Sequence, residues 1–216
     1  MPATNGLSDS IVVLLSGGMD SAVCLALALD ETTKVFPLIF DYGQVHSKEI
    51  DSAIDLCEHY HLTPQIIKII LPSISPLLKQ SKMKIDPKVN YVPFRNTIFL
   101  SIASGYAESI KANKIYYGAN DLDSPDYPDC RPIYIEAMND VLAIHDSDIR
   151  IEGPLMSMKK GQILSLGFGR CVPFEKTWSC HRGLEKSCGK CPGCTNRLRG
   201  FNEVGKADPL EYDLLA

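Results

Sequence analysis

The chain has 216 residues, of which 45% are hydrophobic and 22% are charged, and its formal net charge at pH 7 is −4. This composition is ordinary for a soluble globular protein, and the negative charge argues against a protein that coats nucleic acid. No apolar run is long enough to span a membrane, and the N-terminal residues lack the apolar core of a signal peptide. We therefore expect a cytoplasmic protein with one α/β domain and an appendage.

The sequence IVVLLSGGMDS, at residues 11–21, predicts a buried strand, a tight glycine turn and the start of an apolar helix. Two adjacent glycines let the backbone approach a ligand closely, and the first N–H groups of a helix are free to bind an anion. In the alternative, the serines only cap the helix. The turn predicts a pyrophosphate site formed by Ser16, Gly17, Gly18, Met19, Asp20 and Ser21, with Asp20 placed to hold a metal ion that bridges phosphates.

These glycines do not have the spacing of a dinucleotide fingerprint, and no Gly-Lys-Ser or Gly-Lys-Thr sequence closes a Walker loop. The sequence SGGMDS instead resembles the PP-loop, the pyrophosphate-binding turn of enzymes that use ATP to adenylate a carboxyl, carbonyl or amide oxygen. The resemblance implies that the chain binds ATP.

A second buried strand is predicted at residues 34–40 and ends at Asp41. Ligands of an open parallel sheet bind at the carboxyl ends of its strands, so Asp41 can contact the nucleotide or take a metal-linked role. It can equally well cap the next helix, which is predicted at 47–61. After a third strand at 65–71, the proline-containing connector at 72–93 is interpreted as a lid over the nucleotide or a surface loop.

The next helix begins at the sequence Pro93-Phe94-Arg95-Asn96, where Arg95 is a candidate phosphate ligand or a surface residue. A strand at 114–119 then leads into a loop at 120–131 that contains four Asp residues. So many polar groups beyond the end of a strand predict a substrate pocket.

After a helix begun by Pro132, the chain has a predicted strand at 148–151 and a short helix with Lys159 and Lys160 near its start. Lysines at a helix N-terminus oppose the helix dipole, so we expect at least one of them to neutralise phosphate. The alternation of strands and helices predicts a doubly wound parallel sheet of the Rossmann-like type.

Four cysteines lie close together near the C-terminus in the pattern C-x7-C-x2-C-x2-C. These soft ligands, with tight turns in CGKCPGC, suit a tetrahedral structural zinc site, and an iron–sulfur cluster is the main alternative. In a chain without a secretion signal, the clustering favours a metal over disulfides. The predicted ligands are Cys180, Cys188, Cys191 and Cys194.

We expect the metal to hold together a segment at residues 171–216, beside a nucleotide-binding domain at 1–170. Among the other cysteines, Cys24 and Cys57 are expected in the core, and His181, next to the cluster, is expected on the surface. From residue 159 to residue 206, ten Lys and Arg stand against three Glu. An anionic substrate, RNA or a solvated face can each explain this basic stretch.

The chain as a whole resembles the 7-cyano-7-deazaguanine synthase family, QueC, of queuosine biosynthesis. The resemblance runs from SGGMDS through FDYGQVH, VPFRN and YPDCR to the cysteine cluster and RLRGF. It implies a PP-loop domain with a zinc-binding tail, assembled as a homodimer. It also implies conversion of 7-carboxy-7-deazaguanine to the nitrile with ATP, Mg²⁺ and ammonia, in which the carboxylate is adenylated, ammonia displaces AMP, and a second activation dehydrates the amide.

The same motifs imply roles for individual residues. Asp20, Arg95 and Lys160 are implied to be catalytic, while the SGGMDS turn and Asp41 are implied to bind ATP. The residues implied to bind the substrate are Tyr42, Gln44, His46, Arg95, Asn96, Tyr127, Asp129 and Arg131.

The loop before YPDCR departs from the family, which typically has TDFSG where this chain has LDSPD. This departure suggests an alternative in which the same deazapurine acid is transferred to another amine, such as a protein terminus. The basic tail suggests a second alternative, a PP-loop enzyme that modifies tRNA, against which the negative net charge argues. A non-catalytic nucleotide sensor is the third, and the intact SGGMDS turn and Lys160 disfavour it.

Overall fold

The structure is a computed structural model that describes residues 9–44, 47–71, 92–120, 127–182 and 185–213. At its centre lies a five-stranded, wholly parallel sheet with the strand order β3-β2-β1-β4-β5. The strands are β1 (Ile11–Leu14), β2 (Val35–Asp41), β3 (Gln65–Lys68), β4 (Lys114–Tyr116) and β5 (Arg150–Glu152). The predicted Rossmann-like fold class is therefore confirmed.

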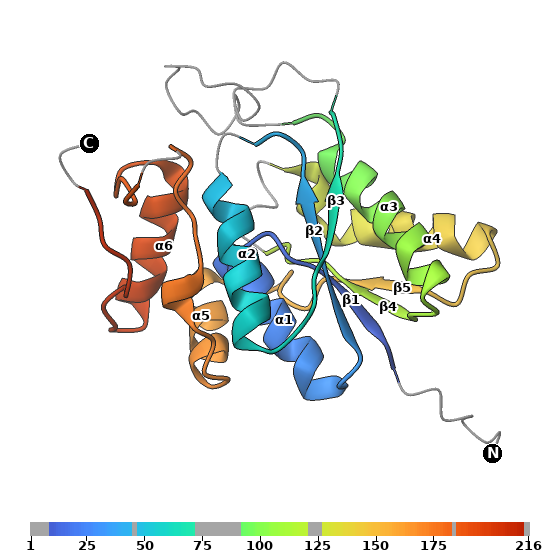
Figure 1. Cartoon of the computed structure of the whole chain (residues 1–216), viewed down its shortest axis with the longest axis horizontal. Helices are drawn as coiled ribbons and strands as arrows, with labels where there is room; N and C mark the ends of the chain where they lie inside the picture. Colours follow the sequence, from blue (N-terminus) through green and yellow to red (C-terminus); the bar gives the residue numbers. More distant parts are fainter. Residues whose placement is uncertain (1–8, 45–46, 72–91, 121–126, 183–184, 214–216) are drawn as a thin grey trace.

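Helices cover both faces of the sheet (Figure 1). On one face lie α1 (Met19–Glu31), α2 (Ser47–His59), α5 (Lys160–Phe168) and α6 (Pro192–Glu203). On the other face lie α3 (Arg95–Ser109) and α4 (Pro132–Ile144). No helix in the described part of the chain is long and apolar enough to cross a membrane.

Strand β1 is apolar throughout because both of its faces are buried. Ile11 and Val13 pack into the core beneath α1, whereas Val12 and Leu14 pack into the core beneath α3. A strand covered by helices on both faces reads as a continuous apolar run rather than an alternating one. Its neighbours β2 and β4 continue in opposite directions across the sheet, so the space beyond the carboxyl end of β1 is the point where doubly wound sheets bind ligands.

Helix α6 begins within the cysteine cluster, contains Cys194, and was not predicted as a helix. Pro192 is its first residue, and the Sγ of Cys191 accepts a hydrogen bond from the N–H of Cys194 as an N-cap. Phe201 of α6 then packs edge-on against Phe174 and Phe168, with ring centroids 5.8 and 5.9 Å away. This helix thus joins the core beneath α1 and α5.

Two of the cysteine expectations are confirmed, since Cys24 and Cys57 are buried in the same core. Cys130 is also buried, and Cys171 is exposed. Of the proposed connector at 72–93, residues 72–91 lie outside the described residues, so its interpretation as a lid or a surface loop stays a prediction.

Candidate active site

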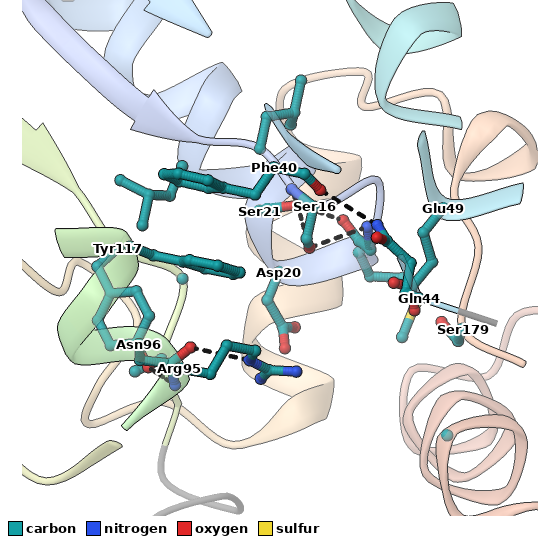
Figure 2. A pocket seen from close by; sticks show the side chains of 18 of the residues that line it. Ser16, Asp20, Ser21, Phe40, Gln44, Glu49, Arg95, Asn96, Tyr117 and Ser179 are labelled. Carbon is teal, nitrogen blue, oxygen red and sulfur yellow. Dashed lines mark hydrogen bonds between the residues drawn. The ribbon is translucent and has the colours of Figure 1, made fainter. Parts of the chain in front are cut away.

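A cleft of about 430 Å³ opens beyond the carboxyl ends of β1, β2 and β4. The glycine turn forms its floor, and side chains from several elements meet around it, as Figure 2 shows. Of the residues selected from the sequence, the cleft is lined by Ser16, Gly18, Met19, Asp20, Ser21, Tyr42, Gln44, Arg95, Asn96, Tyr127, Asp129 and Lys160. The fold therefore brings together most of the sequence-predicted site.

The glycine turn needs glycine for two reasons that the structure makes explicit. Gly17 has a φ of +81°, and a Cβ placed there would lie 2.1 Å from the carbonyl oxygen of Glu49 in α2. The hydroxyl of Ser21 donates to the carbonyl oxygen of Gly18 at 3.0 Å and lies 3.1 Å from the Oγ of Ser16. No side chain caps α1, so the positive end of this helix faces the cleft.

Asp20 and Lys160 form an ion pair in the cleft. The Nζ of Lys160 lies 2.7 Å from both carboxylate oxygens of Asp20, and Asn120 donates to one of these oxygens at 2.8 Å. Lys160 is the first residue of α5 and is held against α6, where a Cβ on Gly200 would lie only 2.5 Å from its Cγ. This packing fixes an almost fully buried ammonium group beside the glycine turn.

The opposite wall carries aromatic rings and a polar network. Phe40 and Phe99 stack with a centroid distance of 4.1 Å. Asn96 donates to the hydroxyl of Tyr117 at 2.7 Å and to the carboxylate of Asp129 at 2.9 Å. Burial raises the pKa of Tyr117 well above its usual range, so this hydroxyl stays protonated.

Arg95 begins α3 and projects into the cleft from this wall (Figure 2). Its guanidinium donates to the hydroxyl of Tyr42 at 3.4 Å and to the side-chain oxygen of Asn96 at 3.4 Å. Both contacts are long, and no acidic side chain in the described part of the chain forms an ion pair with it. The guanidinium therefore keeps its charge available for an anionic ligand.

Sequence reasoning missed a third wall of the cleft, which the C-terminal segment supplies. The N–H of Trp178 donates to the carbonyl oxygen of Gly17 at 2.9 Å, which ties this segment to the glycine turn. The expectation that His181 lies on the surface is wrong, because its side chain lines the cleft. The residues of this wall are Trp178, Ser179, His181, Pro192, Gly193, Asn196 and Arg197.

A further lining residue that the sequence analysis did not select is Glu49. Burial raises the pKa of this carboxyl to about 7, and the nearby Arg95 guanidinium opposes part of the increase. Glu49 lies in α2, shortly after the DYGQ segment. The apolar positions of this helix are sufficient to predict it as a helix packed on the core. A carboxylate in the first turn of a helix is ordinary, so no local pattern marks Glu49 as a site residue.

Three residues predicted to bind ATP or the substrate lie in the described part of the chain but do not line the cleft: Gly17, Asp41 and Arg131. Gly17 belongs to the glycine turn but packs against the backbone of Glu49 in α2, while Arg131 is exposed directly before α4. Asp41 lies 3.9 Å from the Nζ of Lys68 at the sheet edge and accepts a long hydrogen bond from the N–H of Gly43. His46 lies outside the described residues.

The four predicted metal ligands come together next to the third wall. The sulfur atoms of Cys180, Cys188, Cys191 and Cys194 all lie within 4.8 Å of one another, and all four residues are buried. The Sγ atoms of Cys188 and Cys194 are 4.0 Å apart, close to the sulfur spacing of about 3.8 Å that tetrahedral zinc–thiolate bonds of about 2.3 Å require.

Backbone donors surround these sulfurs, as they do in thiolate metal sites. The N–H groups of Cys188 and Cys191 donate to the sulfurs of Cys180 and Cys188, each at 3.4 Å. The N–H of His181 donates to Cys191 at the same distance. Such donors stabilise negative sulfur, so the residues fit a bound Zn²⁺.

Sheet order, glycine turn and cleft together define the class of the protein: a doubly wound α/β protein with the PP-loop fold. Its fold is similar to that of NMN synthetase from Francisella tularensis, with a TM-score of 0.55, 21% identity, and 95% of this chain and 81% of that chain covered. The fold is also similar to that of NH3-dependent NAD synthetase from Campylobacter jejuni, with a TM-score of 0.52 and 22% identity. The match covers 78% of this chain and 67% of that chain.

Within this class the chain belongs to the QueC family. The family described as "Queuosine biosynthesis protein QueC" matches residues 10–205. The 7-cyano-7-deazaguanine synthase of Picrophilus torridus is 46% identical over 217 residues, which cover 94% of this chain and 91% of that protein. The resemblance noted in the sequence is thereby confirmed.

Proposed function

We propose that this chain is a 7-cyano-7-deazaguanine synthase, an ATP-dependent carbon–nitrogen ligase that makes the nitrile from 7-carboxy-7-deazaguanine and ammonia. The observation that carries the proposal is one cleft holding both a pyrophosphate turn and a polar, aromatic wall, in a chain 46% identical to a protein of that name. A carboxylate oxygen is a poor leaving group, and its adenylation converts it into AMP. The residues of the cleft must then bind phosphates and exclude water.

The phosphate side of the reaction falls to the turn and the cations next to it. The free N–H groups at the start of α1 and the hydroxyls of Ser16 and Ser21 bind pyrophosphate oxygens. Lys160 lies beside this turn and neutralises charge that develops on the leaving pyrophosphate. Arg95 approaches from the opposite wall and stabilises the α-phosphate during transfer.

Mg²⁺ accompanies ATP in this proposal, with Asp20 as its protein ligand. Asp20 is the carboxylate nearest the glycine turn, and in the structure Lys160 and Asn120 already hold its oxygens. When ATP is present, the phosphates attract the ammonium of Lys160, which leaves a carboxylate oxygen for the metal. Magnesium held there would add charge neutralisation on the phosphates.

The acid substrate occupies the wall opposite the glycine turn. A flat deazapurine ring fits beside the rings of Phe40, Phe99 and Tyr117, and the amide of Asn96 and the carboxylate of Asp129 match its hydrogen-bonding edge. Tyr42 and Gln44 lie at the end of β2 between the two subsites. We assign the remaining positions, Asp41, His46, Tyr127 and Arg131, to nucleotide or substrate contacts on the family motifs alone.

The other expectations enter as parts of the same proposal. The protein acts in the cytoplasm as a homodimer, with a nucleotide-binding domain at 1–170 and a zinc-binding segment at 171–216. Zinc would be held by the four cysteines and would have no open coordination position, so its contribution is structural. No observation favours transfer to another amine, modification of tRNA or a non-catalytic sensor.

The proposal is tested by AMP and pyrophosphate release from ATP with 7-carboxy-7-deazaguanine, with and without ammonium. Release that depends on this acid, and not on guanine or benzoate, supports the proposed substrate. Steady ATP turnover that ignores the acid would overturn it.

A further inference from the structure

Among the described residues, three carboxylates line the cleft, and those of Asp20 and Asp129 have hydrogen-bond partners. Asp20 is held by Lys160 and Asn120, and Asp129 accepts from Asn96. The carboxylate of Glu49 forms no hydrogen bond or ion pair with any other residue that the structure describes, although this side chain lines the same cleft. A half-buried carboxylate without a partner is costly, so its presence in a cleft indicates a ligand.

The position of Glu49 is fixed by the glycine turn. Because the carbonyl oxygen of Glu49 occupies the space of a Cβ on Gly17, the first turn of α2 packs directly on the pyrophosphate site. In Figure 2, Glu49 lies near Gln44 and Ser179, across the cleft from Arg95, with Asp20 between. A small cation bound at Glu49 would therefore lie beside the proposed phosphate site and away from the guanidinium of Arg95.

The charge of Glu49 can change near neutral pH. Burial raises the pKa of this carboxyl to about 7, and Arg95 is the charged group that opposes the increase. A group with such a pKa accepts and releases protons readily at neutral pH. The charged and titratable groups that line the same cleft are Asp20, Tyr42, Arg95, Tyr117, Tyr127, Asp129, Cys130, Lys160, His181 and Arg197. Lys48 precedes Glu49 in α2, and the elements that contact this helix add Asp41, Glu175 and Lys176.

The proposed reaction needs a general base at the nitrogen atom of the ammonium substrate. An ammonium ion must lose a proton before its nitrogen can attack, and the same nitrogen loses every remaining proton before it becomes a nitrile. None of the cations beside the phosphates can accept these protons, and the oxygens of Asp20 are taken by Lys160 and Asn120 or, with ATP bound, by Asn120 and the metal. The reaction therefore needs an anionic group near the acyl carbon that is free to take them.

We propose that Glu49 binds the ammonium substrate and is the general base for its nitrogen. This inference rests on the proposed function and names the site of its second substrate. Glu49 takes a proton from ammonium, and the resulting ammonia forms a bond to the acyl carbon. The bond from that carbon to the AMP oxygen breaks, and AMP leaves with the electron pair. Glu49, which has passed its first proton to water, then takes a further proton from the nitrogen and leaves the neutral amide.

In the second activation the amide oxygen attacks the α-phosphate of another ATP, pyrophosphate leaves, and the nitrogen loses one proton. Cleavage of the carbon–oxygen bond then releases AMP with that electron pair while Glu49 takes the last N–H proton, and the carbon–nitrogen triple bond forms. Each proton passes from Glu49 to solvent water between steps, so the carboxylate is regenerated.

The test compares Glu49→Gln with Glu58→Gln, an exposed glutamate on the same helix. Nitrile and AMP are quantified over a range of ammonium chloride concentrations at pH 7. For Glu49→Gln we expect the KM for ammonium to rise at least about tenfold and nitrile formation to fall by about a hundredfold, while acid-dependent AMP release continues through hydrolysis. Glu58→Gln should behave as the wild type.

Hydroxylamine separates a role as base from a purely structural role. It is already unprotonated at neutral pH, so its attack on the adenylated acid does not need a base to remove a first proton. We expect hydroxamate formation by Glu49→Gln to lie within about threefold of the wild type. If Glu49→Gln does not fold, Glu49→Asp keeps the charge and should raise the KM for ammonium without changing that for ATP.

Wild-type nitrile kinetics in Glu49→Gln, or equal loss of AMP release and nitrile, would overturn the assignment of Glu49. Absence of acid-dependent AMP release in the wild type would instead overturn the proposed function, so the two failures are distinguishable.

Discussion

The Nζ of Lys160 lies 2.7 Å from both carboxylate oxygens of Asp20, which joins residues 140 positions apart at the edge of one cleft. The pair links the first turn of α1, which follows the glycine turn, to the first residue of α5. It places one cation and one anion where a nucleotide's phosphates and their metal would bind. The pair is thus a central element of the proposed ATP site.

Replacement of Lys160 by Met should lower kcat/KM for ATP by about 10²- to 10³-fold, because an oriented cation beside the phosphates is lost. Lys159→Met is the matched control, since Lys159 is the neighbouring residue and is exposed. Steady-state AMP release measures both variants. Equal activities in the two variants would contradict a role of Lys160 at the phosphates.

Gly17→Ala should destabilise the protein by about 1–3 kcal/mol and weaken ATP binding, because the added Cβ meets the backbone of Glu49 at a positive φ. Gly43→Ala is a control with a similar φ of +73° but open space around the added Cβ. Urea unfolding and ATP titration of the two variants separate backbone strain from the close approach. Equal effects at both positions would contradict the importance of the contact.

Cys191→Ser should lose bound zinc and unfold the third wall of the cleft, since the metal contributes to the folding of its own site. Cys171→Ser, at an exposed cysteine outside the cluster, should retain one zinc per chain. Elemental analysis and thermal unfolding check both variants. Iron in place of zinc in the purified protein, with visible absorbance, would establish the iron–sulfur alternative.

Arg197→Met should destabilise the protein by about 3–5 kcal/mol, because it strands a buried partner charge. The guanidinium is fully buried, lies 2.7 Å from Asp208, and also donates to the hydroxyl of Thr177 at 2.6 Å. Arg199→Met removes an exposed pair with Glu203 and should change the stability by less than about 1 kcal/mol. Urea unfolding should show this difference; similar losses would contradict it.

Glu49→Gln should be more stable than the wild type at pH 8, by roughly 1–3 kcal/mol. The folded-state pKa of Glu49 is raised from 4.5 to about 7, so folding disfavours its charged form and stability falls as the pH rises through this range. Below pH 4.5 both side chains are neutral and the difference should vanish. Unfolding curves at pH 4 and pH 8 measure it, and a pH-independent difference would contradict burial as the cause.

Much of the sheet and of the phosphate site was predictable because both depend on local sequence. The apolar run of β1, the glycine turn and the spacing of Cys188, Cys191 and Cys194 each have a physical meaning within a few residues. The strand order and the pairing of Lys160 with Asp20 depend on contacts across the chain. The helix-dipole argument predicted a lysine at the phosphates and the family motifs selected Lys160, but neither predicted its pairing with Asp20.

The third wall of the cleft could not be predicted, because it depends on where the C-terminal segment docks. The phenyl ring of Phe201 packs into the core beneath α1, and the N–H of Trp178 bonds to Gly17. No periodicity or motif in the sequence predicts either contact. Docking of this segment is also what moves His181 from its expected surface position to the cleft.

The most direct test of the account is mass spectrometry of the product formed from 7-carboxy-7-deazaguanine, ATP, Mg²⁺ and ¹⁵N-ammonium. We expect 7-cyano-7-deazaguanine that carries one ¹⁵N, with AMP and pyrophosphate released at each activation. AMP release that yields no labelled amide or nitrile, even at saturating ammonium, would contradict the proposed ligase activity.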